Sequence, residues 1–170
     1  DYDPTVTTKA HQVYIQNYYV GNTGPQSVYT MAVNYRPGKW NATINFNYMD
    51  RNYIDIYPER RTASAVDMVV RDSEAWKAIV DQERMPGAFT TDLYVSRSIG
   101  TRWITKKLHR KSTSLFASLG VTNLLDKRDI KIAGYEQLRY DFTNRAAGKF
   151  QSFYDYAFGA NFSANISFRF

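Results

Sequence analysis

The sequence predicts an all-β fold, in which antiparallel strands form a segment of a transmembrane β-barrel and one extracellular loop carries short helices. Three observations predict it: an unbroken alternation of apolar and polar residues at the C-terminus, similar alternation upstream, and no apolar run of the roughly 18 residues that a membrane helix needs. We count about six strands. Because membrane barrels need about eight strands to close, we expect the C-terminal part of a larger barrel.

The terminal segment, residues 157–170, alternates without exception. Its apolar positions are Phe158, Ala160, Phe162, Ala164, Ile166, Phe168 and Phe170. Successive side chains of a strand point to opposite faces, so one face is apolar and the other polar. A membrane strand needs about 9 to 11 residues, whereas strands of soluble sheets average about five or six. We therefore favour a membrane strand over a half-buried soluble one, with Ile166, Phe168 and Phe170 as the C-terminal assembly signal.

The composition suits a thin wall of strands better than a thick core. The 170 residues include 14 Tyr and 10 Phe, and the mean hydropathy is −0.51. With no Cys and with His11 and His109 far apart, the sequence predicts no metal site, no catalytic residues and no cofactor. The net charge of +6 fits nucleic acid, anionic lipid or an acidic ligand, but the basic run 106–111 reads as a barrel turn, so nucleic acid is not an expected partner.

The first fifty residues are predicted to contain one β-hairpin, which follows an irregular start and an extended segment. Residues 1–9 are irregular, and a Tyr-rich extended segment at 10–20 ends in a turn at 21–25. Segments 27–36 and 40–50 alternate on either side of a Pro-Gly-Lys turn, which predicts a β-hairpin with aromatic residues beside the turn. The chain starts with neither an initiator Met nor a signal peptide, so we expect a processed chain or a piece of a longer one.

Between residues 51 and 88 the alternation stops. Ser64 is a predicted helix start, and apolar residues then recur at helical spacing in two short helices that break near Asp72. Ser73 is expected to cap the second helix. A long excursion with its own structure, inside a chain of strands, is typical of a functional loop.

Strands resume at 89–104, where Arg97 interrupts the apolar face, and at 115–121, which Asn123 ends. A second long loop, 124–154, precedes the terminal strand. Short and long connections thus alternate, as in outer-membrane barrels with short periplasmic turns and long extracellular loops. Only the short connection at 21–26 departs from this scheme.

Several short motifs occur in a characteristic order. They are Asn-Tyr-Ile-Asp at 52–55, Pro-Glu-Arg-Arg-Thr at 58–62, Asp-Gln-Glu at 81–83, Val-Thr-Asn-Leu-Leu-Asp at 121–126, Gly-Tyr-Glu-Gln at 134–137 and Asn-Ile-Ser-Phe-Arg-Phe at 165–170. Together they resemble the C-terminal barrel of TonB-dependent outer-membrane receptors. The closest group is the Bacteroidota type with a carboxypeptidase-regulatory-like N-terminal domain, related to SusC-like transporters.

The resemblance implies a 22-stranded barrel in the bacterial outer membrane, whose plug and N-terminal domains lie outside residues 1–170. It implies energised uptake of a nutrient such as a glycan, peptide or siderophore, and no enzymatic activity. The implied partners are outer-membrane lipid, the rest of the barrel with its plug, and the TonB-type energy-transducing complex, with a surface lipoprotein as a further candidate. Two alternatives stay open: a structural or adhesive barrel whose loops bind a partner protein, and a soluble basic sheet that binds RNA.

Candidate ligand contacts lie in the two long loops. They are Tyr53, Asp55, Tyr57, Arg60, Arg61, Tyr135, Glu136, Gln137 and Arg139. A guanidinium fork pairs well with carboxylate or phosphate, and tyrosine rings stack on sugars or aromatic siderophores.

The same residues have a structural alternative. Arg60 and Arg61 could form an ion-pair network with Glu59 and Asp55 that holds the first loop, and we favour this explanation for them. In the second loop, a local pair of Glu136 with Arg139 and a sharp turn at Gly134 are expected.

Overall fold

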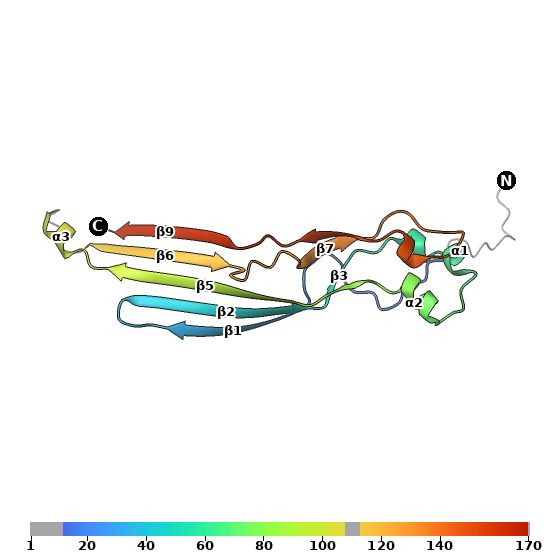
Figure 1. Ribbon diagram of the computed structural model, residues 1–170, viewed down its shortest axis with the longest axis horizontal. Helices are drawn as coiled ribbons and strands as arrows, with labels where there is room; N and C mark the ends of the chain where they lie inside the picture. The colour runs from blue at the N-terminus through green and yellow to red at the C-terminus, as the bar shows by residue number, and fades with distance from the viewer. Residues whose placement is uncertain (1–11, 108–112, 170) are drawn as a thin grey trace. The chain divides into compact units, whose positions relative to one another are not determined.

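The computed structural model describes residues 12–107 and 113–169 and shows an all-β, antiparallel architecture with a few short helices (Figure 1). The chain divides into two compact units. The sheet unit contains residues 27–50, 87–130 and 157–170, and the loop unit contains residues 1–26, 51–86 and 131–156. No helix within the described residues has both the length and the apolar character needed to cross a membrane.

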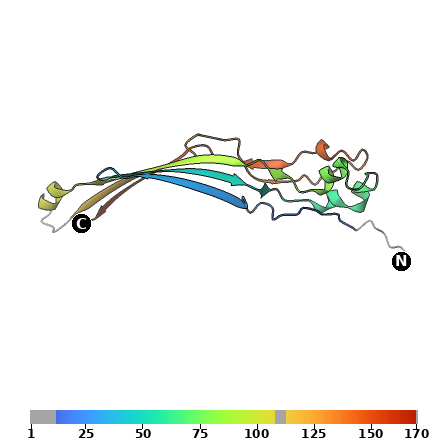
Figure 2. The ribbon, with the colours of Figure 1, turned by 90° about the horizontal axis from the view of Figure 1, so that it is seen from below.

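The sheet unit is built on one five-stranded antiparallel sheet. Its strands, in their spatial order, are β1 (Ser27–Tyr35), β2 (Trp40–Asp50), β5 (Ala88–Ile99), β6 (Ser114–Thr122) and β9 (Asn161–Arg169). Each strand therefore lies beside the sheet strand that precedes it in the chain. Figure 2 shows the sheet from its edge as a single curved layer, in keeping with the natural twist of β-strands. The helix α3 (Arg102–Lys107) lies between β5 and β6 in sequence.

The strand register sorts side chains by chemistry across the whole sheet. One continuous row of paired positions runs from Val33 through Ile44, Leu93 and Val121 to Phe162. Further rows on this apolar face hold Tyr29, Met31, Tyr35, Trp40, Ala42, Phe46, Tyr48, Phe89, Val95, Ile99, Leu115, Ala117, Leu119, Ala164, Ile166 and Phe168. A shift of one residue in any pairing would move a strand's apolar set to the other face.

Much of the apolar face is exposed. Phe162 is 73% exposed and Ile166 76%, and every described position of β9 is classed as exposed. The predicted alternation of the terminal segment is therefore present in β9, which begins at Asn161, and its phenylalanines are not buried in a core. Ile166 and Phe168 lie on this strand, while Phe170 lies outside the described residues.

Aromatic residues gather at both ends of the apolar face. Tyr29, Tyr48 and Phe89 are paired in one row at the end near the long connections. Tyr35 and Trp40 flank the β1–β2 turn at the other end. Arg97, which interrupts the apolar pattern, is paired with Trp40, and its guanidinium carbon lies 4.7 Å from that ring's centroid. This cation–π contact accounts for a cation on an otherwise apolar face.

The opposite face is mostly uncharged and polar, and its side chains bond across strands. Thr30 donates to Asn47 at 2.9 Å, Thr43 donates to Asn34 at 2.7 Å, and the Asn47 amide donates to Asp92 at 2.8 Å. These bonds between neighbouring strands support the same register that aligns the apolar rows.

The loop unit is assembled from three separate stretches of chain. Its elements are β3 (Asn52–Tyr53), η2 (Pro58–Arg61), α1 (Ala63–Val66), α2 (Glu74–Val80), β4 (Arg84–Met85), β7 (Lys131–Tyr135), η3 (Ala147–Lys149) and β8 (Phe153–Tyr156). β3 pairs with β4, β7 pairs with β8, and an isolated bridge joins Asp55 to Tyr135. The two long loops of the sequence therefore fold together.

A small apolar core forms around the helices of the loop unit. Its buried members are Ala65, Val66, Trp76, Ile79 and Val80, all from α1 and α2. The predicted break between the helices is confirmed: Asp72 adopts a positive φ of 63°, and the Ser73 hydroxyl accepts a 3.2 Å hydrogen bond from the Trp76 amide. This N-cap satisfies one of the amides left unbonded at the start of α2.

Three expectations about the strands were wrong. Segment 10–20 is not a strand where the structure describes it, because Val13 and Gln16 form only isolated bridges to the loops, and the sheet has five strands rather than six. β5 ends at Ile99 instead of continuing to 104, since the chain there turns into α3. The expected irregular start, His11, His109 and most of the basic run fall outside the described residues, although Lys106 and Lys107 belong to α3.

Gly134 was expected at a sharp turn but lies within β7, where its role is close approach. A methyl group there would lie 2.7 Å from the Phe153 carbonyl oxygen and 2.9 Å from a methyl of Ile54. We expect Gly134→Ala to lower the free energy of unfolding of the loop unit by about 1 to 3 kcal/mol, because backbone must shift. Denaturant unfolding measures the change.

Gly148→Ala is the matched control, since a methyl group at Gly148 meets nothing within 4 Å. It should be neutral or stabilising by less than about 1 kcal/mol. Equal effects of the two substitutions would contradict the close approach at Gly134.

Candidate functional site

A buried ion pair joins the two long loops. Arg61, at the end of η2, donates to both carboxylate oxygens of Glu136, with Nη1 and Nη2 each 2.5 Å from an oxygen. The side chains are 1% and 7% exposed, respectively. This two-point geometry is the strongest form of the arginine–carboxylate contact.

Backbone groups complete the surroundings of this pair. Arg61 also donates to the carbonyl oxygens of Tyr57, Val80 and Asp81, at 3.3, 3.0 and 3.1 Å. The Tyr57 amide in turn donates to Glu136 at 2.7 Å. Because the donors of Arg61 are used within the protein, this residue holds the loops together and is not placed to bind a ligand.

The predicted ion-pair partners were wrong for these residues. Arg61 pairs with Glu136, 75 positions away, and not with Glu59 or Asp55. Glu136 correspondingly does not pair with Arg139, which is exposed. Asp55 instead accepts a hydrogen bond from the Asn22 amide group at 2.9 Å.

The predicted tyrosines are divided between interior and surface. Tyr53 is 7% exposed and stacks on Tyr19 with ring centroids 4.3 Å apart. Tyr135 is 53% exposed and contacts the Phe153 ring at 5.4 Å. Gln137 donates to the carbonyl of Gln151 at 2.7 Å. Of the nine predicted ligand contacts, only Arg60 and Glu136 line the main cavity described next.

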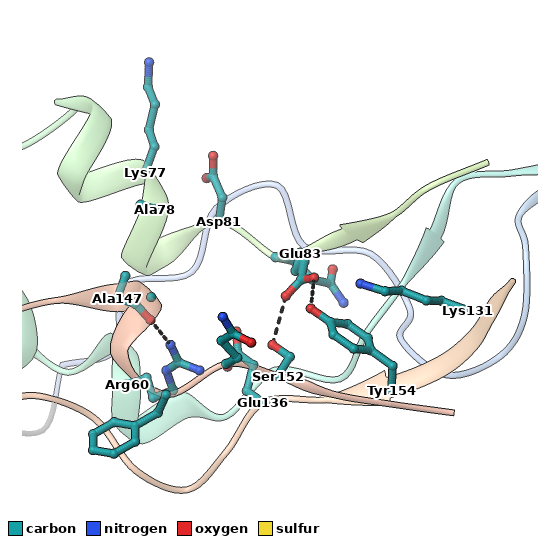
Figure 3. Close-up of a pocket in the computed structure, with 14 residues that line it drawn as sticks. Arg60, Lys77, Ala78, Asp81, Glu83, Lys131, Glu136, Ala147, Ser152 and Tyr154 are labelled. Carbon is teal, nitrogen blue, oxygen red and sulfur yellow. Dashed lines mark hydrogen bonds between the residues drawn. The ribbon is translucent and has the colours of Figure 1, made fainter. Parts of the chain in front are cut away.

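The loop unit contains a cavity of about 630 Å³ whose lining is rich in charge (Figure 3). Its lining includes Arg60, Lys77, Asp81, Gln82, Glu83, Lys131, Glu136, Ala147, Phe150, Gln151, Ser152 and Tyr154. The size falls within the range of about 300 to 1,000 Å³ that is usual for small-molecule sites. The cavity is thus the candidate functional site.

One wall is a hydrogen-bonded cluster around Glu83. Its two carboxylate oxygens accept hydrogen bonds from the Tyr154 and Ser152 hydroxyls, at 2.5 and 2.8 Å, which Figure 3 shows as dashed lines. Burial, and then this bond to Glu83, raise the pKa of Tyr154 to about 12. The Lys131 ammonium lies 3.3 Å from the centroid of the Tyr154 ring. The phenol therefore stays protonated and fixes the carboxylate.

Arg60 differs from Arg61 in how its side chain is used. It is 8% exposed, and Nη2 donates to the Ala147 carbonyl at 3.0 Å. This is the side chain's one hydrogen bond to any described residue, although a guanidinium carries five N–H donors. Arg60 is the lining residue with the most donors left for a ligand.

Most of the lining was missed by sequence reasoning. Lys77 lies on α2 and Glu83 lies between α2 and β4 in the first loop, and Lys131, Ser152 and Tyr154 come from the second. The available signal was that both loops carry charges and aromatics between turn residues. Nothing local indicates which charges of one loop meet which of the other.

Neither a metal cluster nor a known relative assists in assigning the site. Within residues 12–107 and 113–169, no group of three or more His, Asp or Glu residues is arranged to hold a metal ion. No family model, curated protein or solved structure matches the chain.

Removing one member of the buried pair should open the loop unit. We expect Glu136→Gln to cost about 3 to 5 kcal/mol, because the Arg61 charge would stay buried without its counterion. The double change Arg61→Met, Glu136→Leu should recover much of that loss, since no charge is then buried. Amide hydrogen exchange across α2 measures the free energy of opening.

The exposed pair of Arg128 and Asp126, with N and O 3.1 Å apart, supplies the control. Arg128→Met should have little effect, because solvent screens an ion pair this exposed. A Glu136→Gln effect no larger than this would contradict a fixing role for the buried pair.

The carboxylate of Asp141 makes the stability of the loop unit depend on pH. The Asp141 carboxylate accepts a hydrogen bond from Lys149 at 3.0 Å, and this bond, the largest cause, lowers its pKa from 3.8 to about 2. A depressed pKa stabilises the folded state above pH 3.8, and this contribution is lost as the pH falls toward 2. We expect Lys149→Gln to return the pKa of Asp141 toward 3.8, which a carboxyl-carbon NMR titration would detect.

Proposed function

We propose that this chain forms the C-terminal strands and two external loops of a TonB-dependent outer-membrane receptor, which takes up a nutrient with energy from the proton motive force. The observation that carries the proposal is the register of the sheet, which lines up the apolar residues of five strands on one exposed face. In water such a face is an unusually large apolar patch, whereas lipid would cover it.

The two faces of the sheet support a wall between lipid and water. A membrane barrel presents apolar residues to lipid and polar residues to its interior. The uncharged, hydrogen-bonded side chains opposite the apolar face, such as Asn47 and Thr43, fit a wet interior. Sheet strands of 9 to 12 residues are also as long as a tilted membrane strand requires.

The aromatic rows at the two ends of the apolar face support a sheet that spans the bilayer from one interface to the other. Trp40 and Tyr48 bound the apolar stripe of β2 and lie eight positions apart, about 27 Å along an extended strand. A tilt of about 40° reduces this to about 21 Å, slightly less than the roughly 25 Å height of the apolar band of outer-membrane barrels. The two rows then coincide with the interfaces, where aromatic rings are enriched.

The connections between strands support an assignment of the extracellular and periplasmic ends of the sheet. The chain leaves the sheet for the loop unit between β2 and β5 and between β6 and β9, both at the same end of antiparallel strands. The β1–β2 and β5–β6 connections lie at the other end. In outer-membrane barrels the long loops are extracellular and the short turns periplasmic. The segment 12–26 joins the loop unit, so it enters β1 from the extracellular end in this scheme.

The two edges of the sheet support the proposal that the barrel contains further strands. Among the described residues, β1 and β9 each pair with one neighbouring strand. An unpaired edge in hydrocarbon costs several kcal/mol for each exposed backbone group, so the proposal requires additional strands that close the barrel. We propose a 22-stranded barrel with a plug, in contact with lipid and the energy-transducing complex, and with a transport rather than an enzymatic role.

Two measurements test the proposal. The protein should fractionate with outer membranes and need detergent to stay monodisperse, so a monomer in plain buffer would overturn it. Cells with and without the chain are then offered labelled glycans, short peptides and ferric siderophores. Uptake of at least one that needs both the chain and the proton motive force supports transport, whereas a membrane-embedded chain with no such uptake would favour the structural or adhesive barrel.

The assigned faces can be tested on β9. Phe162→Arg or Ala164→Arg should lower stability in the membrane by about 2 to 4 kcal/mol if the position lies near the bilayer midplane. Ser163→Arg, one position away on the polar face, is the matched control and should be far milder. Folding into lipid vesicles at increasing denaturant gives the free energies, and equal tolerance at positions 162 and 163 would contradict the assignment.

A further inference from the structure

We infer that the cavity of the loop unit binds a small organic anion through a carboxylate held by Arg60. The inference deepens the proposed function by naming a ligand class for an external loop site, and it rests on that function for its role in uptake. Its physical basis lies within the loop unit alone.

The first argument is the state of the Arg60 guanidinium. The residue is 8% exposed and lines the cavity, and its side chain makes one hydrogen bond within the described part of the chain, to the Ala147 carbonyl. No Arg60 nitrogen is among the fully buried side-chain atoms that lack a partner, so its unused donors reach solvent and can bond a ligand that enters the cavity. A carboxylate matches the guanidinium fork with two parallel bonds.

The second argument is the charge balance of the lining. Three cations, Arg60, Lys77 and Lys131, come from η2, α2 and β7 (Figure 3). Of the three carboxylates, Glu136 is neutralised by Arg61, whereas the hydroxyl groups that bond to both oxygens of Glu83 do not cancel its charge. Within the described part of the chain, the Asp81 carboxylate accepts one long hydrogen bond, 3.4 Å, from the Asn17 amide group. The cavity therefore offers more uncompensated positive than negative charge, which favours an anion.

The third argument concerns the rest of the ligand. Phe150 and Gln151 line the same cavity as Arg60, so a ligand that also carries an apolar ring and an amide finds partners for both within it. N-benzoylglycine carries all three groups and serves as the probe. Its neutral analogue, N-benzoylglycinamide, has almost the same shape without the charge.

The experiment uses the protein as its host makes it, extracted in detergent, with binding followed by calorimetry. We expect the acid to bind at least about tenfold more tightly than the amide, since charge-assisted bonds are roughly twice as strong as neutral ones. Arg60→Gln should remove this preference, and Arg60→Lys should keep only part of it because an ammonium lacks the fork. Arg71→Gln, at an exposed arginine of the same unit outside the lining of this cavity, is the control and should leave the preference intact.

Several results would overturn the inference. They are equal affinity for acid and amide, a preference that survives Arg60→Gln, stronger competition by inorganic phosphate than by the acid, and no binding of the acid at about 10 mM. If Arg60→Gln does not fold, the same binding measurement is made on Lys77→Gln, a change at an exposed lysine of the cavity lining. A loss of acid affinity with amide affinity unchanged supports the site, and no change in either overturns it.

The ligand class and the membrane function fail in different ways. A protein that inserts into membranes but does not distinguish acid from amide loses only the carboxylate site. A protein that stays monomeric without detergent and still prefers the acid loses only the proposed membrane function.

Discussion

The constraint on which the sheet depends is its register. With a side-chain period of two, five strands can present one apolar face only if every neighbouring pair is aligned to the residue. The aligned row from Val33 to Phe162 meets this condition, and the bonds of Asn47 to Thr30 and Asp92 hold it from the other side. In water this arrangement would leave a broad apolar surface unburied, so the sheet gains its stability only when that surface is covered.

Stability in the loop unit has a different origin. Its helices are too short to be stable alone, and its apolar core is small. The Arg61–Glu136 pair and the carbonyl bonds around it connect stretches that are far apart in sequence. The net stability that such a buried charge pair contributes is small, because burial removes both charges from water. The pair instead favours one arrangement of the two loops, since any arrangement that separates the partners leaves a buried charge without its counterion. The cavity walls, which come from both loops, depend on this arrangement.

Local sequence patterns predicted what local physics determines. The β1–β2 hairpin follows from two alternating segments around a Pro-Gly turn, and the Ser73 cap follows from a hydroxyl placed before an apolar helical repeat. The Tyr-rich segment 10–20 carries similar strand propensity, but its backbone partners, Thr62 and Asp81, lie in loops distant in sequence. The pairing of Glu136 with Arg61 rather than the nearby Arg139 could not be read from spacing, because sequence distance sets which partners are near only within one element.

The exposed connection between α1 and α2 has a consequence for proteolysis. Met68 and Val70 are 80% and 77% exposed, while the flanking helices are held by separate anchors. On one side the Tyr140 hydroxyl bonds to the Ala65 carbonyl, and on the other Trp76 is buried. An enzyme that cut the chain here would release neither end. The nicked molecule would separate into two pieces only in denaturant, and its cavity would survive the cut.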